Sequence, residues 1–461
     1  MRRAALASLA GAALGLAGCT SLAPRYERPG APVPEQLPGG EGTARAADIP
    51  WRELVREPRL RQVIEQALAK SRNLRRAALN IEAARAQYRI QRARALPSVD
   101  AVAAVTSTRT VVDSSNHTAT ATLYSAQVGL AAWEIDLFGR IKSLSDAQLQ
   151  AYLSTVEAAN ATRTSLIAET AIAYLTLAAD HGRLAIARDT MDISKRTMDL
   201  TEQLVGGGTS NRGDYWQVAT VYQQARADVA ALTAAIAQDR NALELLAGGP
   251  VSDALLPDAL PDQLDWFAEV PVGLSSDVLL ARPDVRAAEH DLQAANANIG
   301  AARAQFFPSL TLTASGGLAS LALTALFTGP GAVFALAPSL AVPLFRGGAN
   351  QANLEFTQVQ KQALIASYEL AIQSAFREVA DALAVRATLK DQLAAQTALV
   401  EASTRSFELA QARYKAGVDT FLTTLVSQRT LYAAKSSLVA TQLAALGNRI
   451  VLYRVLGGGL K

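Results

Sequence analysis

The hydrophobic and polar positions of the chain follow two periods, and the change from one to the other falls at a proline. Before Pro308, alanine and leucine recur every three or four residues, which is the period of a helix with one apolar face. After it, Leu310, Leu312 and Ala314 alternate with serine and threonine, which is the period of a strand. Because proline cannot donate a helical hydrogen bond and biases the preceding residue toward extended geometry, the helix must end there. The pattern predicts a long helix that leads directly into a two-faced strand.

The same change of period occurs a second time, at Pro97. Residues 73–99 are a weaker copy of residues 279–312, and the two prolines lie 308 − 97 = 211 positions apart. One half of the chain therefore repeats the other. The matched pairs at this offset are Ala77 with Ala288, Ala84 with Ala295, Ala86 with Ala297, Ala93 with Ala304 and Ser98 with Ser309.

Each half carries two predicted strands, at residues 98–112 and 119–137 in the first half and at 308–324 and 331–345 in the second. A strand of about 14 residues is longer than the roughly 10 that a membrane-spanning strand requires. Apolar residues on one face, with small or polar residues on the other, are typical of the wall of a membrane barrel. We therefore expect four barrel strands per chain.

Two irregularities are expected in these strands. The apolar phase shifts near Trp133, which predicts a bulge. Pro338 and Pro343 are expected where the fourth strand leaves the sheet, because proline cannot donate to a ladder. Residues 304–345 contain no charged residue. Their prolines and glycines nevertheless exclude a transmembrane helix.

Each strand pair leads into a long helix without proline. The first is predicted to run to about Val205, some 65 residues or about 100 Å, with His181 and Gly182 as a candidate break. Glycines then turn the chain into a return helix at 213–247. The second copy runs to Arg413, turns, and returns over 421–456. We expect repeat 1 at residues 51–248, a proline-rich linker at 249–278 and repeat 2 at 279–457.

The N-terminus reads as a secretory signal over residues 1–18, with Arg2 and Arg3 before an apolar run that is too short to span a membrane as a mature helix. The residues before Cys19 resemble a bacterial lipoprotein signal, in which this cysteine becomes the acylated N-terminus. Thr20, rather than aspartate, favours the outer membrane. Residues 19–50 fit an extended, lipid-anchored tether. The alternative is an ordinary signal peptide with an incidental cysteine.

Composition excludes several classes of protein. The formal charge of +3 includes Arg2 and Arg3, so the mature chain carries 3 − 2 = +1, which indicates no nucleic-acid partner. A single cysteine allows no internal disulfide, and the three histidines are scattered, so we expect neither a metal site nor a cofactor. The sequence contains no phosphate loop and no nucleophile motif that would indicate an enzyme. A soluble coiled-coil scaffold or adaptor would suit the helices but leaves the duplicated strand pairs unexplained.

Four strands cannot close a barrel, and an open sheet edge in lipid leaves backbone groups unpaired at several kcal/mol each. Three copies would supply about 12 strands around a polar lumen, continued by about twelve rows of helix. The sequence thus predicts an α+β membrane protein, a homotrimeric 12-stranded β-barrel joined to a long periplasmic α-helical barrel.

Four long motifs carry a resemblance to a known family: LLARPDVRAAEHDLQAANANIGAARAQFFPSLTLTASGG, WEIDLFGRI, PSLAVPLFRGG and RYKAGVDTFLTTLVSQR. With these motifs the chain resembles the TolC-like outer-membrane efflux factors and, with Cys19, their OprM-like lipoprotein branch. The resemblance implies a passive exit duct that works with an inner-membrane pump, expected to be of the proton-driven RND type, a periplasmic adaptor and outer-membrane lipids. The resemblance does not identify the exported substrate.

The resemblance also implies a gate at the helical tip, where the turns at Gly208 and Gly417 converge. Tyr414 is expected to hydrogen-bond Asp214 across neighbouring helix pairs and so to hold the pore shut. Leu422 and Arg429 occupy positions that line the constriction. The alternative is that Tyr414 and Asp214 are ordinary surface residues at a helix end.

The chain departs from the family pattern at two places in the tip. The acid that the family often has nine residues after the second turn glycine is Val426 here, so an acidic ring is either lost or replaced by Asp419. In the first half, Leu204 and Val205 replace the arginine and tyrosine expected before the turn. The electrostatics of the gate are therefore expected to differ from those of the family.

Overall fold

The computed structural model describes residues 21–38, 49–111, 114, 116–208, 210–273, 275–328, 330–416 and 418–459. The predicted signal segment 1–18, Cys19 and Gly417 lie outside the described residues. The chain divides into two compact units. The sheet unit comprises Met1–Gly30, Asn80–Val156 and Ala287–Glu369, and the helical unit comprises Ala31–Leu79, Glu157–Arg286 and Leu370–Lys461. Each unit therefore draws on both halves of the sequence.

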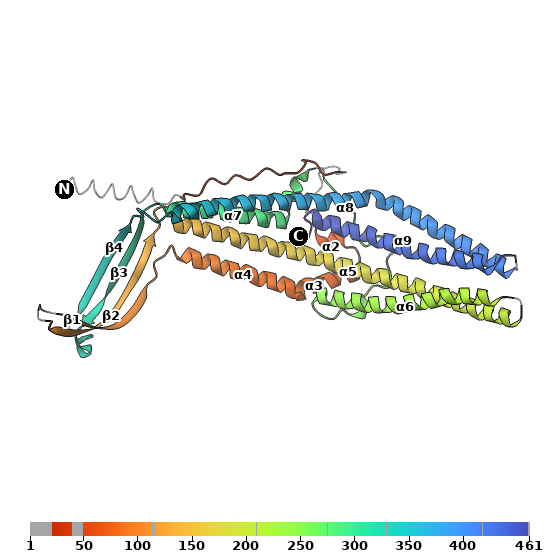
Figure 1. Cartoon of the computed structure of the whole chain (residues 1–461), viewed down its shortest axis with the longest axis horizontal. Helices are drawn as coiled ribbons and strands as arrows, with labels where there is room; N and C mark the ends of the chain where they lie inside the picture. Colours follow the sequence, from red (N-terminus) through yellow and green to blue (C-terminus); the bar gives the residue numbers. More distant parts are fainter. Residues whose placement is uncertain are drawn as a thin grey trace. The chain divides into compact units, whose positions relative to one another are not determined.

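In the described part of the sheet unit, four antiparallel strands lie in the order β1-β2-β3-β4 (Figure 1). The central pairing, of β2 with β3, joins the two sequence repeats. The outer strands β1 and β4 each have one strand neighbour. The bounds are Asp100–Val111 for β1, Thr118–Ile135 for β2, Ser309–Ser320 for β3 and Ala332–Ala341 for β4.

One face of this sheet is apolar over most of its length and becomes polar toward the β1–β2 turn, where Ser107 is opposite Thr122 and Arg109 is opposite Thr120. Residues that pair directly across two strands share a face, and on this face Trp133 is opposite Leu312 and Leu310 is opposite Leu340. On the other face Thr311 is opposite Ser339. The register therefore aligns the apolar positions of all four strands into one surface. Its members include Ala101, Ala103, Val105, Tyr124, Ala126, Val128, Leu130, Ile135, Ala314, Leu318, Phe334 and Leu336.

The predicted bulge is confirmed. The register of β2 against β3 shifts between Leu130 and Trp133, and Ala132 has a φ of 48°. The backbone N–H of Ala132 donates to Oγ1 of Thr313 at 3.1 Å, so a side chain satisfies a group that the ladder leaves out. The extra residue returns Trp133 to the apolar face.

The prediction for the late prolines is half right. Pro343 lies beyond the end of β4, but Pro338 lies inside it, opposite Leu312. An edge strand tolerates proline because one of its two hydrogen-bonding sides has no partner in the sheet. The sequence pattern did not reveal that β4 is an edge.

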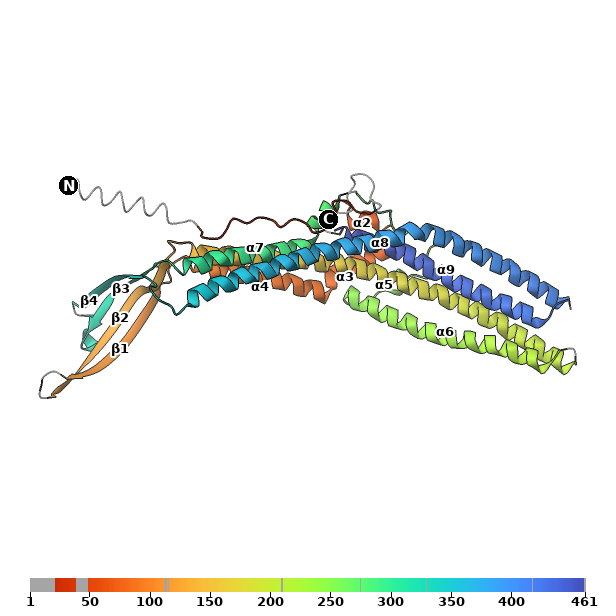
Figure 2. The same cartoon turned by 45° about the horizontal axis from the view of Figure 1, so that its top comes forward.

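The long helices are α5 (Arg140–Gly206) and α8 (Ala349–Lys415), with 67 residues each. In the helical unit, α6 (Arg212–Ala247) runs back along α5, and α9 (Phe421–Val455) runs back along α8 (Figures 1 and 2). Among the described residues, no helix combines the length and hydropathy needed to cross a membrane. The other helices are α2 (Trp51–Leu54), α3 (Pro58–Lys70), α4 (Arg72–Ala93) and α7 (Pro283–Ala304), with short 3-10 turns η2 (Asp253–Leu255), η3 (Ser276–Ala281) and η4 (Leu323–Ala325).

Two expectations about helix breaks are wrong. Helix α5 is continuous through His181 and Gly182, because one glycine in a helix costs only about 1 kcal/mol relative to alanine. An ion pair of 2.9 Å between Asp180 and Arg183 also bridges this point. Conversely, the helical spacing of alanine, leucine and isoleucine from Arg59 to about Leu96 predicts one helix, which the structure divides at Ser71 into α3 and α4. The Oγ of Ser71 accepts the N–H of Leu74 at 3.4 Å and so caps α4.

A buried arginine holds the start of the second repeat within the helical unit. Arg282 is almost fully buried, and its Nε and Nη2, which form one edge of the guanidinium, donate to the two carboxylate oxygens of Asp284 at 3.0 and 2.7 Å. It also donates to Glu378 in α8 at 2.9 Å and to the carbonyl of Val455 at the end of α9 at 2.9 Å. These contacts join the start of the second repeat to α8 and α9.

Residues 21–28 lie in extended form along α7 in the sheet unit. Arg28 makes a two-pronged ion pair with Glu289 at 2.7 and 2.9 Å, and Asn296 donates to the carbonyl of Pro24 at 2.7 Å. A Cβ at Gly300 would come within 2.6 Å of the Ala23 nitrogen, so the absent side chain lets the segment approach the helix.

Candidate functional site at the helix turns

The turn between α5 and α6 closes with helix-capping contacts. Gly208 has a φ of 77°, which glycine adopts without strain. The N–H of Gly208 bonds the carbonyl of Val205 at 3.1 Å, and the N–H of Ser210 bonds the carbonyl of Leu204 at 3.2 Å. The side chain of Asn211 caps α6 by accepting the N–H of Asp214 at 2.9 Å.

Asp214 belongs to this turn. Its Oδ2 accepts hydrogen bonds from Oγ of Ser210 at 3.1 Å and from Nδ2 of Asn211 at 2.9 Å. A carboxylate in the first turn of a helix is also stabilised by the helix dipole. Within one chain, Asp214 thus fixes the geometry of its own turn.

The turn between α8 and α9 is closed by an ion pair that the sequence did not indicate. Arg413 donates to both carboxylate oxygens of Asp419, at 2.6 and 3.1 Å. These hydrogen bonds lower the pKa of Asp419. Asp419 is therefore charged and already paired, so its charge is compensated within its own chain.

Tyr414 packs in the apolar core of the tip. Its ring meets that of Phe421 edge to face, with centroids 5.3 Å apart. The cluster around it contains Val218, Phe421 and Leu425, with Met198 and Val221 packed against it. It thereby joins the ends of α5, α6, α8 and α9. Among the hydrogen bonds of the described residues, none joins Tyr414 to Asp214, so their bond across neighbouring helix pairs stays a prediction.

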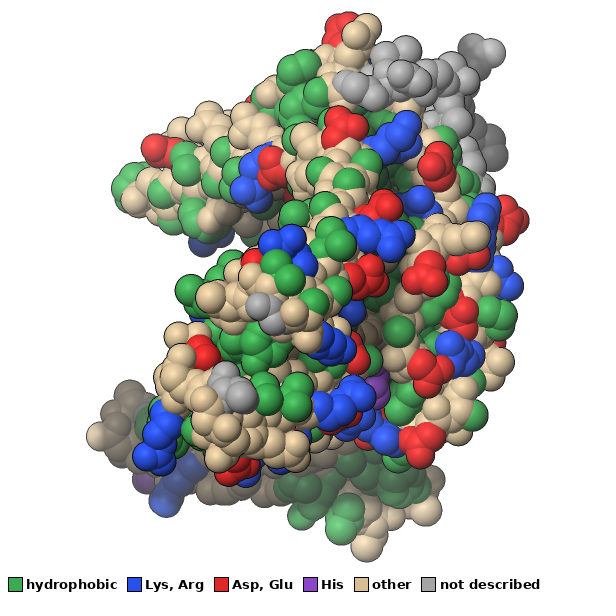
Figure 3. Space-filling view, turned by 90° about the vertical axis from the view of Figure 1, so that its right-hand side faces the viewer, with side chains coloured by type: hydrophobic (Ala, Val, Ile, Leu, Met, Phe, Trp, Pro, Cys, Tyr) green, Lys and Arg blue, Asp and Glu red, His purple; other side chains and the backbone are tan. Residues whose placement is uncertain are grey.

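Leu422, Val426 and Arg429 lie on one face of α9, at spacings of four and three residues. All three are exposed, Leu422 by 53% and Val426 by 56%. This tip face presents two apolar side chains followed by a cation. Figure 3 looks onto the same end and shows basic and acidic side chains interspersed among uncharged ones.

The sequence did not predict two polar contacts between the helix pairs. Nε2 of Gln428 in α9 donates to Oγ of Ser194 in α5 at 3.0 Å, and both groups are buried. The hydroxyl of Tyr432 in α9 donates to Oδ2 of Asp228 in α6 at 2.8 Å. Burial, and then the hydrogen bond to Asp228, raises the pKa of Tyr432 to about 12. The sequence feature that could have indicated these contacts is a polar residue on the otherwise apolar side of each helix.

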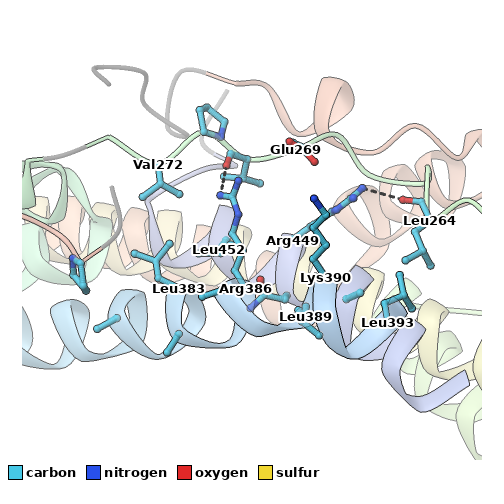
Figure 4. A pocket seen from close by; sticks show the side chains of 18 residues that line it. Leu264, Glu269, Val272, Leu383, Arg386, Leu389, Lys390, Leu393, Arg449 and Leu452 are labelled. Atoms are coloured by element: carbon cyan, nitrogen blue, oxygen red, sulfur yellow. Dashed lines mark hydrogen bonds between the residues drawn. The ribbon is translucent and has the colours of Figure 1, made fainter. Parts of the chain in front are cut away.

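A cavity of about 990 Å³ lies in the helical unit between α8, α9 and residues 264–272 (Figure 4). Arg386 in α8 donates to the carbonyl of Val270 at 2.9 Å. Arg449 in α9 donates to the carbonyls of Leu264 and Phe267, at 2.9 and 2.7 Å. These arginines fasten the linker to the helices. Among the described residues, no cluster of histidine, cysteine and acidic side chains could hold a metal ion.

Comparison with known proteins gives consistent likenesses over nearly the whole chain. The model of the family described as "Outer membrane efflux protein" matches residues 63–249 and 274–458. The solvent efflux pump outer membrane protein SrpC of Pseudomonas putida is 43% identical over 458 residues, covering 97% of both chains. The outer membrane protein OprJ of Pseudomonas aeruginosa is 39% identical over 452 residues, covering 97% of this chain and 94% of OprJ.

The solved structures give the same result for the fold. The crystal structure of the open state of the Neisseria gonorrhoeae MtrE outer membrane channel superposes with a TM-score of 0.87 at 38% identity. The match covers 96% of this chain and 99% of the other. The likeness therefore extends over the sheet, the long helices and the turns.

Proposed function

The chain belongs to the outer membrane efflux protein family, as the outer-membrane channel component of an efflux pump, and from that premise we propose that three copies form a gated exit duct. The observation that carries the proposal is the four-stranded sheet with one apolar face and two open edges. In lipid, the unpaired backbone groups of β1 and β4 must be satisfied by other chains. Three copies supply 3 × 4 = 12 strands, a number within the known range of barrels.

The apolar face of the sheet suits contact with lipid, and the opposite face suits the lumen. Gln127, Thr311, Thr313 and Ser339 lie on that opposite face. These four are uncharged and small or polar, and the acids on the same face, Asp100 and Glu134, lie near the strand ends, so we expect such a lumen to select cargo weakly. We assign selection of cargo to the pump, and because SrpC is a solvent efflux component, small organic molecules are the proposed cargo.

The partners follow from the absence of an energy source in a passive duct. An inner-membrane pump, of the proton-driven RND type, and a periplasmic adaptor are the proposed partners, together with outer-membrane lipids. Co-purification from cells in which pump, adaptor and channel are cross-linked tests this assignment. Recovery of the channel with a pump of another energy class would replace the RND assignment.

We also propose that Cys19 is lipidated once residues 1–18 are removed. The docking of residues 21–28 along α7 supports this, because it fixes the chain only two residues after the anchor. Metabolic labelling with a palmitate analogue should mark the wild type and not Cys19→Ser. Equal labelling of both would exclude this anchor.

The gate is proposed to lie at the tip. Leu422 and Val426 would form an apolar constriction and Arg429 a ring of positive charge, since the acid expected at Val426 is missing and Asp419 is paired with Arg413. The proposed bond between Tyr414 and Asp214 of a neighbouring helix pair would hold the closed state. Within each chain, the contacts of Gln428 with Ser194 and of Tyr432 with Asp228 support a closed arrangement of the helix pairs.

Single-channel recording in planar bilayers tests the proposed function. The purified protein should insert as trimers that show small, brief conductance events with a closed gate. Arg429→Glu should change the preference between cations and anions because it reverses the sign of the proposed ring. If neither the wild type nor any gate variant conducted ions, the proposed function as a duct would be contradicted.

A further inference from the structure

Helix α4 carries three stripes that each repeat every seven residues. The half-buried stripe, which the rest of the chain covers, contains Leu74, Ala77, Ile81, Ala84, Tyr88 and Gln91. A second, exposed stripe is apolar and contains Leu79, Ala83, Ala86 and Ile90. A third, also exposed, is basic and contains Arg75, Arg85, Arg89 and Arg92, with Glu82 and Ala78 between them.

The first two stripes have the spacing of two coiled-coil seams, which is what a helix in a closed ring needs for its two neighbours. With the 3.5-residue period of such seams, their centres lie about 150° apart on one side of α4 and about 210° apart on the other. This step rests on the proposed trimeric duct, which is a ring of twelve helices. At each helix of such a ring, the directions to the two neighbouring helices lie about 150° apart on the lumen side. The narrow side of α4 therefore faces the lumen.

The basic stripe lies in the middle of the wide side and so faces away from the lumen. The narrow side carries Asn80 and Gln87, which suits an uncharged lumen. Among the described residues, Arg85 has one long ion pair, 3.8 Å to Glu82, and neither Arg89 nor Arg92 has an acidic partner. Their charges are therefore available to an anion outside the ring.

This stripe ends beside the apolar face of the sheet. Arg92 precedes the first residue of β1 by 100 − 92 = 8 positions. The indole N–H of Trp133, on the apolar face, donates to the carbonyl of Ala95 in the connection between α4 and β1 at 3.3 Å. Leu96 is also exposed there. Tryptophan at the edge of an apolar surface is typical of a membrane boundary.

The length of the stripe fits a headgroup layer. From Arg85 to Arg92 the helix rises about 10 Å, while the headgroup zone of one leaflet is roughly 5–8 Å thick. Arginine binds phosphate oxygens through two parallel N–H groups, and basic clusters next to a bilayer favour anionic lipids. We propose that Arg85, Arg89 and Arg92 bind the phosphate groups of anionic phospholipids in the periplasmic leaflet.

Native mass spectrometry of the detergent-solubilised trimer tests the proposal. The trimer is titrated with phosphatidylglycerol, with phosphatidylcholine and with inorganic phosphate. Each arginine near an anionic lipid increases the affinity about fivefold. The wild type should therefore retain phosphatidylglycerol at least tenfold more strongly than phosphatidylcholine. Arg85→Gln/Arg89→Gln/Arg92→Gln should abolish that preference, and the triple lysine variant should keep most of it.

The control removes the same charge from exposed positions of the helical unit, as Arg188→Gln/Arg196→Gln/Arg226→Gln, and should keep the preference. Equal retention of both lipids by the wild type, or an unchanged preference in the stripe variant, would overturn the proposal. So would binding of free phosphate as strong as that of the lipid, or capture of an acidic protein without lipid. A protein that forms no trimer would instead contradict the proposed function itself.

Discussion

The hydroxyl of Tyr432 in α9 donates a 2.8 Å hydrogen bond to the carboxylate of Asp228 in α6. Together with the bond from Gln428 to Ser194, it joins the α8–α9 pair to the α5–α6 pair within one chain. A gate that opens by moving one pair against the other must break these two bonds, whereas opening between chains would leave them intact.

Replacement of Tyr432 by phenylalanine should therefore loosen the closed state. The lost bond to a carboxylate in a half-buried site is worth about 1–2 kcal/mol, enough to increase the open fraction roughly 5- to 30-fold. Single-channel recording measures this fraction. Tyr222→Phe on α6 removes a comparable hydroxyl with no such partner and should behave like the wild type. An unaltered open fraction in Tyr432→Phe would place the opening motion elsewhere.

The same pair should resist alkaline conditions. The pKa of Tyr432 is raised to about 12, above the ordinary value of 10.0, so its contribution is fully present below pH 10 and is lost as the pH rises through about 12. Titration of Tyr432 should therefore not change the conductance of the wild type between about pH 7 and pH 9.5. A gating transition near pH 9 that disappears in Tyr432→Phe would contradict this assignment.

The ion pair of Arg413 with Asp419 should make the second turn sensitive to acid. Arg413 lowers the pKa of Asp419, so the stabilising contribution is present above about pH 4, the ordinary range of aspartate, and is lost as the pH falls through the lowered value. Asp419→Asn should remove the acid-dependent component of conductance. Arg405→Gln, which breaks an exposed pair elsewhere on α8, serves as the control. Identical acid responses in wild type and Asp419→Asn would rule out this role.

The double variant Tyr414→Phe/Asp214→Asn should raise leakage through the closed duct. The hydroxyl of Tyr414 is the group expected to reach Asp214 across neighbouring helix pairs, whereas its ring, packed on Phe421, is retained in phenylalanine. Uptake of a large antibiotic by intact cells and single-channel conductance both report the change. Unchanged conductance would count against a bond between these residues.

Arg282→Met should destabilise the helical unit. The substitution leaves Asp284 and Glu378 without their shared cation and frees the carbonyl of Val455, at a cost of about 3 kcal/mol. Thermal unfolding of the detergent-solubilised protein, followed by circular dichroism, should show a midpoint lowered by several degrees. Arg405→Met removes an exposed arginine and should have little effect. Equal midpoints for both variants would show that the buried network contributes no net stability.

Much of the fold was predictable because its main signals are changes of period. Pro97 and Pro308 mark where helix gives way to strand, and the phase shift at Trp133 marks a bulge that the register confirms. The resemblance to the family, the channel fold and the function in efflux at the outer membrane are confirmed by the comparisons. These features depend on spacing along the chain, which a single sequence contains.

The features that could not be predicted depend on contacts between distant segments. Pro338 was misplaced because the order of strands in the sheet is not written in the strand itself. The break at Ser71 and the continuity through Gly182 are decided by a cap and an ion pair of similar small energy. Tyr432 and Asp228 lie 204 positions apart, so neither residue type nor local spacing could pair them.

The mass of the mature protein in a membrane-mimetic environment tests the central claim most directly. Native mass spectrometry of protein extracted from the outer membrane should give three copies, because the edges of β1 and β4 must pair between chains. The same sample should conduct ions in planar bilayers. A single water-soluble copy, with no bilayer-embedded sheet and no conductance, would contradict the account.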